Sequence, residues 1–172
     1  MSGNIEVLIP ERDVSERIAE MGQIISERYA GKEIVLVGVL TGGVFFLTEL
    51  AKNITVPVVI DFMAASSYGT NTESSGHVVI TKDVSRSVEN KNVIIVEDII
   101  DSGNSLKCLS EIIKEKNPAT VEIAVLLDKP ERRKVDIHAD YVGFEIPDEF
   151  VVGMGLDYEY KLRNLPYIGI IK

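Results

Sequence analysis

The 172-residue chain is poor in the residues that build disulfide scaffolds, zinc sites and membrane spans. Its single cysteine, Cys108, excludes an internal disulfide. Its two histidines, His77 and His138, are far apart in the sequence and have no nearby cysteine, so no zinc-like ligand set exists. No apolar run approaches the roughly 20 residues of a membrane-spanning helix, and the residues after Met1 do not resemble a secretory signal. We therefore expect a cytoplasmic protein without a membrane partner.

Positive charge is also scarce. The chain has 18 Lys and Arg against 27 Asp and Glu, a net charge of −9, which disfavours nucleic acid as the main partner because such binding depends on neutralising phosphates. Apolar residues make up 45% and charged residues 26%, as in ordinary globular proteins. No repeat, low-complexity tract or linker divides the chain, so residues 1–172 are predicted to form one domain with its own core.

The most informative stretch is residues 93–106, which read VIIVEDIIDSGNSL. The β-branched run 93–96 is typical of a strand buried on both faces. An acidic turn is predicted next, with Glu97, Asp98 and then Asp101, and apolar residues return at helical spacing from Leu106 onward. Such a turn lies at the carboxyl end of a strand, where open α/β sheets bind ligands.

The two halves of this turn suit two different chemical groups. Residues 102–105 can present backbone N–H groups at a helix N-terminus, which binds phosphate. Glu97 and Asp98 can accept hydrogen bonds from a sugar diol or coordinate Mg²⁺. Together these groups describe a site for a ribose 5-phosphate, whereas the alternative is a solvated acidic turn with an ordinary Ser cap. A Walker-type P-loop is excluded, because no Gly-Lys-Ser/Thr has the required spacing.

Elsewhere strands and helices alternate, which predicts an α/β fold with a mostly parallel twisted sheet flanked by helices. The strand-rich C-terminal part predicts a small hood subregion over the active site. Predicted helices span 14–29, 44–52 and the segment after the acidic turn. Strands are predicted at 5–9, 34–39, 56–62, 77–82, 93–96, 121–127, 141–144, 150–152 and 167–171.

Several other segments have both a functional and a purely structural interpretation. The turn 40–43 contains Gly42 and Gly43, which allow the backbone to approach a phosphate or simply make a tight turn. Residues 64–76 are small and polar, so Ser67 and Tyr68 belong to a loop that is either solvated or a lid. Lys129 follows a strand, where a solvated position is usual, and the basic cluster 131–134 is interpreted as a solvated loop.

The stretch 93–106 resembles the phosphoribosyl-pyrophosphate (PRPP) motif of the type I phosphoribosyltransferases: a hydrophobic run, two acids, two apolar residues, an acid and a Ser/Thr/Gly loop. The phrase DYVGFEIPDEFVVGMGLDYEYKLRNLPYIGII, residues 140–171, is similar to the signature of the hypoxanthine-guanine branch of that family. The resemblance covers nearly the whole chain. It implies a transferase that uses Mg²⁺ and converts hypoxanthine or guanine and PRPP into IMP or GMP and pyrophosphate, in a homo-oligomer that is a dimer or a tetramer.

The resemblance also implies a role for each site residue. Glu97 and Asp98 would hold the ribose hydroxyls and Mg²⁺, and Asp101 would be the acid/base at purine N7. The 5-phosphate and pyrophosphate groups would be bound by Ser102, Gly103, Asn104 and Ser105, and by Thr41, Gly42, Gly43 and Arg163. The purine would be bound by Lys129 at its 6-oxo group, by stacking on Phe150 and by backbone groups of Val151. Asp157 would lie at this purine site and hold a second Mg²⁺, while Ser67 and Tyr68 would cap the lid.

Three positions depart from the family pattern, and two rival functions stay open. Some members have a Lys where Thr41 and Asn104 stand, and an aromatic residue is common at the position of Met154. The resemblance also implies a cis peptide bond between Leu40 and Thr41. One rival is a PRPP-sensing regulator that binds RNA or DNA, which the net charge disfavours. The other is a transferase for uracil, adenine or xanthine. Lys129 and residues 150–157 argue against uracil and adenine, whereas xanthine stays open as a side activity.

Overall fold

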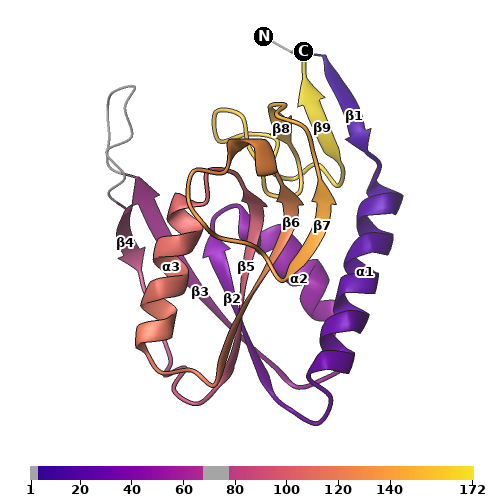
Figure 1. Cartoon of the computed structure of the whole chain (residues 1–172). Coiled ribbons are helices and arrows are strands. Elements are labelled where there is room, and N and C mark those ends of the chain that lie inside the picture. The colour runs from indigo at the N-terminus through magenta and orange to yellow at the C-terminus, as the bar shows by residue number, and fades with distance from the viewer. Residues whose placement is uncertain (1–3, 68–77) are drawn as a thin grey trace.

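The main body of the protein is a six-stranded sheet with helices on both faces (Figure 1). A computed structural model describes residues 4–67 and 78–172. The strand order is β4-β3-β2-β5-β6-β7, in which only β4 runs antiparallel to its neighbour. These strands are β2 (Ile34–Leu40), β3 (Val58–Ser67), β4 (Val78–Lys82), β5 (Asn92–Ile100), β6 (Thr120–Asp128) and β7 (Tyr141–Glu145).

The helices α1 (Glu11–Arg28) and α2 (Gly43–Lys52) cover one face of this sheet, and α3 (Asn104–Glu115) covers the other (Figure 1). Each helix carries an apolar stripe at helical spacing. On α1 the buried side chains include Val14, Ile18, Met21 and Ile25. The layers confirm the predicted fold class. Cys108 on α3 is only partly buried. In the described part of the chain, no helix is both long and apolar enough to cross a membrane.

The central strand β5 is longer than its sequence pattern predicts. It pairs in parallel with β2 and β6, and its pairing with β6 continues from Asn92 to Ile100. The prediction of an acidic turn directly after Val96 is therefore wrong, because Glu97 and Asp98 lie within the strand. The backbone groups of β6 satisfy those of β5 in this region, so the strand continues despite the two acids. The turn begins at Asp101.

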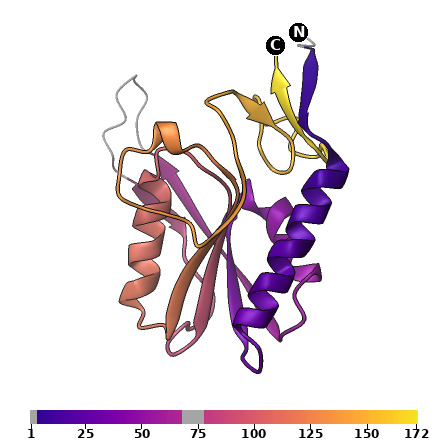
Figure 2. The same ribbon diagram turned by 45° about the vertical axis from the view of Figure 1, so that its right-hand side comes forward.

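A second, three-stranded antiparallel sheet forms the hood, in the order β1-β9-β8. It contains β1 (Ile5–Ile9), β8 (Val151–Val152) and β9 (Ile168–Ile171). Figure 2 shows the hood beyond the carboxyl ends of the parallel strands. Of the strands in the C-terminal part, β7 lies at the edge of the main sheet, where it pairs with β6, and the hood takes β1 from the N-terminal part.

Two predicted loops also differ from the structure. The strand β3 continues to Ser67, since Ala64 to Ser67 pair with β4, so this part of the predicted loop 64–76 is a strand. In the basic cluster, residues Pro130–Arg132 form the short 3₁₀ helix η1. The strand residues 64–67 find their backbone partners in β4, whereas the 3₁₀ turn is closed by local bonds from the N–H groups of Arg132 and Arg133 to the carbonyl oxygens of Lys129 and Pro130.

Candidate active site

Two adjacent carboxyl groups lie near the end of β5, where Asp98 is buried and Glu97 is half-buried. Asp98 is 8% exposed, and its Oδ1 accepts a hydrogen bond from the N–H of Ile99 at 2.8 Å. Burial, followed by the negative charge of Asp98, raises the pKa of Glu97 well above its usual range. Burial also raises the pKa of Asp98, although hydrogen bonds and the nearby charge of Arg163 oppose the shift. The pair is therefore costly to ionise and would be stabilised by a cation or by hydroxyl donors.

The glycine turn between β2 and α2 lies directly against these carboxyl groups. A Cβ atom on Gly42 would be 1.9 Å from Oδ2 of Asp98, and one on Gly43 would be 2.8 Å from the carbonyl oxygen of Val96. The glycines are thus required by the close approach of the two segments. The Leu40–Thr41 peptide bond is cis, as the resemblance implied. The side chain of Thr41 is exposed.

The segment after β5 forms a pocket of about 220 Å³ at the start of α3. Gly103 precedes the helix with a φ of +84°, a left-handed conformation that favours glycine. The N–H of Asn104 donates to Oγ of Ser102 at 3.4 Å. The lining of the pocket combines the two adjacent acids, Asp101, small polar residues and apolar residues: Glu97, Asp98, Ile99, Ile100, Asp101, Ser102, Gly103, Ser105 and Leu106.

Lys129 is buried, which excludes the solvated strand end that was the structural alternative. The residue is 7% exposed, and its N–H donates to the carbonyl oxygen of Ile100, which places it beside the end of β5. Its Nζ donates to the carbonyl oxygen of Glu149 at 2.6 Å and lies 3.8 Å from Oδ1 of Asp148. A buried ammonium group of this kind must keep an acceptor, and a ligand carbonyl can supply one.

Asp101 and Lys129 are linked by a residue that the sequence analysis did not assign to the site. Nε of Arg132 lies 2.8 Å from Oδ1 of Asp101, and its NH1 lies 3.2 Å from Oδ1 of Asp148. Asp148 in turn faces Lys129. No short motif predicts this chain of charges, because it depends on how the 130–132 turn folds back over β5.

Arg133 was also misinterpreted as part of a solvated loop. Its side chain is 14% exposed, and its guanidinium donates to the carbonyl oxygens of Asp101 and Ile137, at 3.1 and 2.6 Å, and to the carboxylate of Asp128. It therefore joins the end of β6 to the loop after β5. A run of four charged residues in the sequence gave no sign that this arginine is half-buried and bonded to two other elements.

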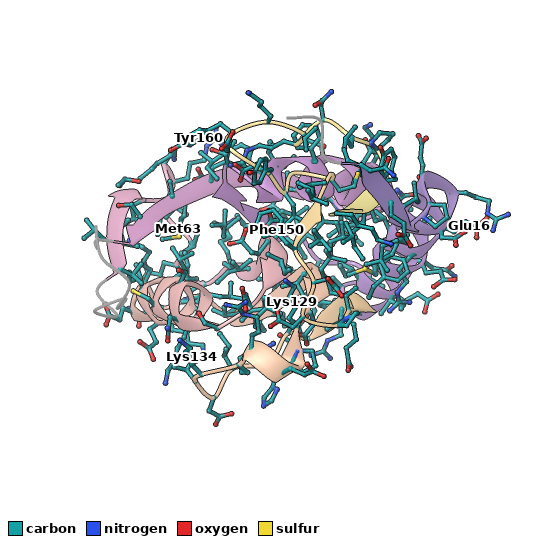
Figure 3. The ribbon with its side chains drawn as sticks, turned by 90° about the horizontal axis from the view of Figure 1, so that it is seen from above. Glu16, Met63, Lys129, Lys134, Phe150 and Tyr160 are labelled. Carbon is teal, nitrogen blue, oxygen red and sulfur yellow. The ribbon has the colours of Figure 1, made fainter. Side chains whose placement is uncertain are left out.

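The hood supplies an aromatic platform next to Lys129. The residue after Glu149 is Phe150, which is 56% exposed, whereas its neighbour Val151 is 5% exposed within β8. The ring of Phe150 meets that of Tyr158 at a centroid distance of 5.9 Å and an interplanar angle of 87°. Viewed from above, Phe150 lies between Lys129 and Tyr160 (Figure 3). A planar ligand can stack on this exposed ring while Lys129 reaches its edge.

The hood also contains an Asp–Arg ion pair, on the side that faces the glycine turn. NH2 of Arg163 lies 2.8 Å from Oδ1 of Asp157, and NH1 of Arg163 donates to the carbonyl oxygen of Gly155. Gly155 has a φ of +101°, and a Cβ atom there would be 1.9 Å from the carbonyl oxygen of Gly42. The hood is therefore in direct contact with the glycine turn that covers Asp98.

A magnesium ion fits the donor set at Glu97 and Asp98, because Mg²⁺ binds one or two carboxylates together with water and substrate oxygens. In residues 4–67 and 78–172, no three carboxylate, histidine or cysteine groups gather as a ready-made metal site. Asp157, the third predicted ligand, is paired with Arg163. Of the predicted lid residues, Ser67 ends β3, and Tyr68 lies outside the described residues.

Comparison with known proteins identifies the class. A phosphoribosyl transferase domain model matches residues 11–159, and the chain belongs to this family of transferases.

Its relatives narrow the class to the hypoxanthine-guanine branch. Hypoxanthine phosphoribosyltransferase of Salmonella typhimurium is 49% identical over 171 residues, or 98% of this chain and 96% of the relative. Hypoxanthine-guanine phosphoribosyltransferase of Staphylococcus epidermidis is 52% identical over 166 residues, or 96% and 93%. A crystal structure of a hypoxanthine phosphoribosyltransferase from Staphylococcus aureus has a TM-score of 0.94 and 50% identity, covering 97% and 91% of the two chains. The predicted family and fold class are confirmed.

Proposed function

We propose that the protein transfers the 5-phosphoribosyl group of PRPP to hypoxanthine or guanine, giving IMP or GMP and pyrophosphate. One observation carries the proposal. The loop 102–105, the two adjacent acids Glu97 and Asp98, and Asp101 line a single pocket, and the buried ammonium of Lys129 is joined to it through Arg132 and Asp148. The site thus combines groups for a ribose phosphate with an ammonium that requires an acceptor.

The sugar end of the site accounts for binding and orientation of PRPP. Backbone N–H groups of residues 102–105 at the start of α3 would hold the 5-phosphate. Glu97 and Asp98 would accept hydrogen bonds from the ribose hydroxyls. The turn from Thr41 to Gly43 and the guanidinium of Arg163 would bind the pyrophosphate group as it leaves ribose C1.

The purine end accounts for proton transfer and base selection. As purine N9 bonds to ribose C1, the base loses a proton from N7, and Asp101 would accept it. Lys129 would donate to the 6-oxo group, Phe150 would stack on the ring, and backbone groups of Val151 would contact the purine edge beside Asp157. Adenine has an amino group in place of the 6-oxo acceptor, so one N–H of the buried ammonium, beyond the one that Glu149 accepts, would have no partner and we expect adenine to be rejected.

The proposal includes Mg²⁺ at Glu97 and Asp98, with Asp157 serving a second ion. When bound, magnesium would neutralise charge on the departing pyrophosphate. Three properties remain predictions from the sequence: assembly into a homo-oligomer that is a dimer or a tetramer, a cytoplasmic location and a single domain.

Incubation of the protein with PRPP, Mg²⁺ and each purine in turn tests the proposal. Hypoxanthine and guanine should yield nucleotide and pyrophosphate, and excess chelator should abolish turnover until Mg²⁺ is restored. Comparable turnover of adenine would contradict the role of Lys129. An assay with xanthine as the third base shows whether the protein also converts xanthine as a side activity. A protein that binds PRPP but converts no base would be a PRPP-sensing regulator instead.

A further inference from the structure

The ring of Phe150 is largely exposed and pairs with one other aromatic ring. More than half of the residue is exposed, at 56%, although Val151 beside it is buried in β8. Its backbone is held from two sides, since its own carbonyl oxygen accepts from the N–H of Ile171 in β9 at 3.5 Å and the carbonyl oxygen of the preceding Glu149 accepts from Lys129. The ring itself meets Tyr158 nearly at a right angle, at a centroid distance of 5.9 Å. Edge-to-face pairs of this geometry are favourable because the positive edge of one ring faces the negative face of the other.

Tyr158 is in turn held by a tight hairpin between Asp157 and Arg163. The N–H and carbonyl groups of Tyr158 and Lys161 bond to each other at 2.9–3.0 Å, and both residues between them, Glu159 and Tyr160, have positive φ values. The positive φ values at both central residues are those of a type I′ turn, which fixes the backbone on either side of it. Tyr158 therefore has a well-defined position relative to the backbone of the hairpin.

The base of this hairpin is anchored to the groups assigned to pyrophosphate. Oδ2 of Asp157 accepts from the N–H of Tyr160 at 2.8 Å, while its Oδ1 lies 2.8 Å from Arg163. One continuous set of contacts thus runs from Arg163 through Asp157 and Tyr158 to the ring of Phe150. The two ends of this set correspond to the two substrates of the proposed reaction.

We propose that Tyr158 is a positioning residue, which holds the ring of Phe150 in the orientation that stacks on the purine. This inference rests on the proposed function and adds a residue to it. Tyr158 acts through Phe150 and has no assigned contact with PRPP. Its loss should therefore weaken purine binding while PRPP binding is preserved.

The test is steady-state kinetics of Tyr158→Ala with hypoxanthine and PRPP varied separately. The KM for hypoxanthine should rise about 2- to 12-fold, the range that edge-to-face pairs contribute in mutant cycles. The KM for PRPP should stay within about twofold of the wild type, as should kcat at saturating purine. Tyr158→Phe keeps the ring and should restore the purine KM.

The neighbouring residue provides a matched control. Tyr160 belongs to the same turn and is 92% exposed, so Tyr160→Ala removes an identical side chain without disturbing Phe150. Its purine KM should equal that of the wild type.

If Tyr158→Ala does not fold, Tyr158→Leu retains apolar bulk without a ring and tests the same loss of the aromatic pair.

A double mutant separates positioning from direct contact. In a Phe150→Leu background there is no ring to orient, so adding Tyr158→Ala should leave the purine KM unchanged. A further rise of the same size as in the wild-type background would show that Tyr158 acts independently, which overturns the inference. An unchanged purine KM in Tyr158→Ala alone would overturn it as well. A wild-type protein that converts neither purine would overturn the proposed function itself, and the inference with it.

Discussion

Replacing the buried Lys129 is the most direct test of the proposed base selection. Lys129→Met removes the ammonium and keeps an unbranched apolar side chain of similar length. In the structure Nζ of Lys129 has a carbonyl acceptor at 2.6 Å and a carboxylate oxygen at 3.8 Å, and the side chain is 8% exposed. A purine 6-oxo group would bind an ammonium that is already desolvated and oriented.

The expected loss follows from the strength of one hydrogen bond to a charged donor. Such a bond contributes about 1.5–3 kcal/mol, which corresponds to a decrease of about 10- to 160-fold in kcat/KM for hypoxanthine. Adenine should be affected in the opposite sense, because the variant has no ammonium to leave unpaired. The ratio of hypoxanthine turnover to adenine turnover should therefore decrease by a larger factor than either turnover rate changes by itself.

The assay is nucleotide formation from each base at saturating PRPP, with the KM for PRPP as an internal check. Lys134→Met is the matched control, because Lys134 is an exposed lysine five positions further along the chain, outside the contact network of Lys129. Figure 3 shows it at the periphery of the molecule. Hypoxanthine kinetics that are equal in Lys129→Met, Lys134→Met and the wild type would refute the argument that the ammonium recognises the base.

Three other predictions concern the proposed general base Asp101, the contact between Gly155 and Gly42, and the stability of the fold at low pH. Asp101→Asn should lower turnover by about 10²- to 10⁴-fold, with the affinity for PRPP nearly unchanged, and a loss of only a few-fold in steady-state assays would exclude Asp101 as the base. Gly155→Ala forces a Cβ atom to within 1.9 Å of the Gly42 carbonyl at a φ of +101° and should lower both turnover and thermal stability. Gly31→Ala, with a φ of +74° and open space around it, should cost only about 1–3 kcal/mol of stability, with normal turnover in the same assays. Burial acts to raise the pKa of Asp61, but three backbone N–H donors outweigh burial and lower that pKa. The contribution of Asp61 to the free energy of unfolding is therefore present above about pH 4 and lost below it. Urea unfolding should accordingly show Asp61→Asn less stable than the wild type by about 1–2 kcal/mol at pH 7, and a gap that does not shrink in acid would contradict this sign.

The local pattern of the chain was enough to predict the α/β class and the position of the loop and helix start after β5. Strand β2, helix α1 and helix α3 follow from runs of buried apolar residues with period-specific spacing, which depend on neighbours in sequence. The small residues from Ser102 to Ser105 indicate a helix start for the same reason. Residues that are close in sequence must be close in space, so this part of the site needed no fold to be predicted.

Contacts between distant segments were decided only by the tertiary structure. Glu97 and Asp98 were expected in a turn, but pairing with β6 keeps them in the strand, and burial there raises the pKa of each. Arg132 and Arg133 had the composition of a solvated loop, yet their partners come from other elements. A sequence specifies which groups a side chain can bind, whereas the packing of strands and hood determines which groups it meets and how much water is excluded from them.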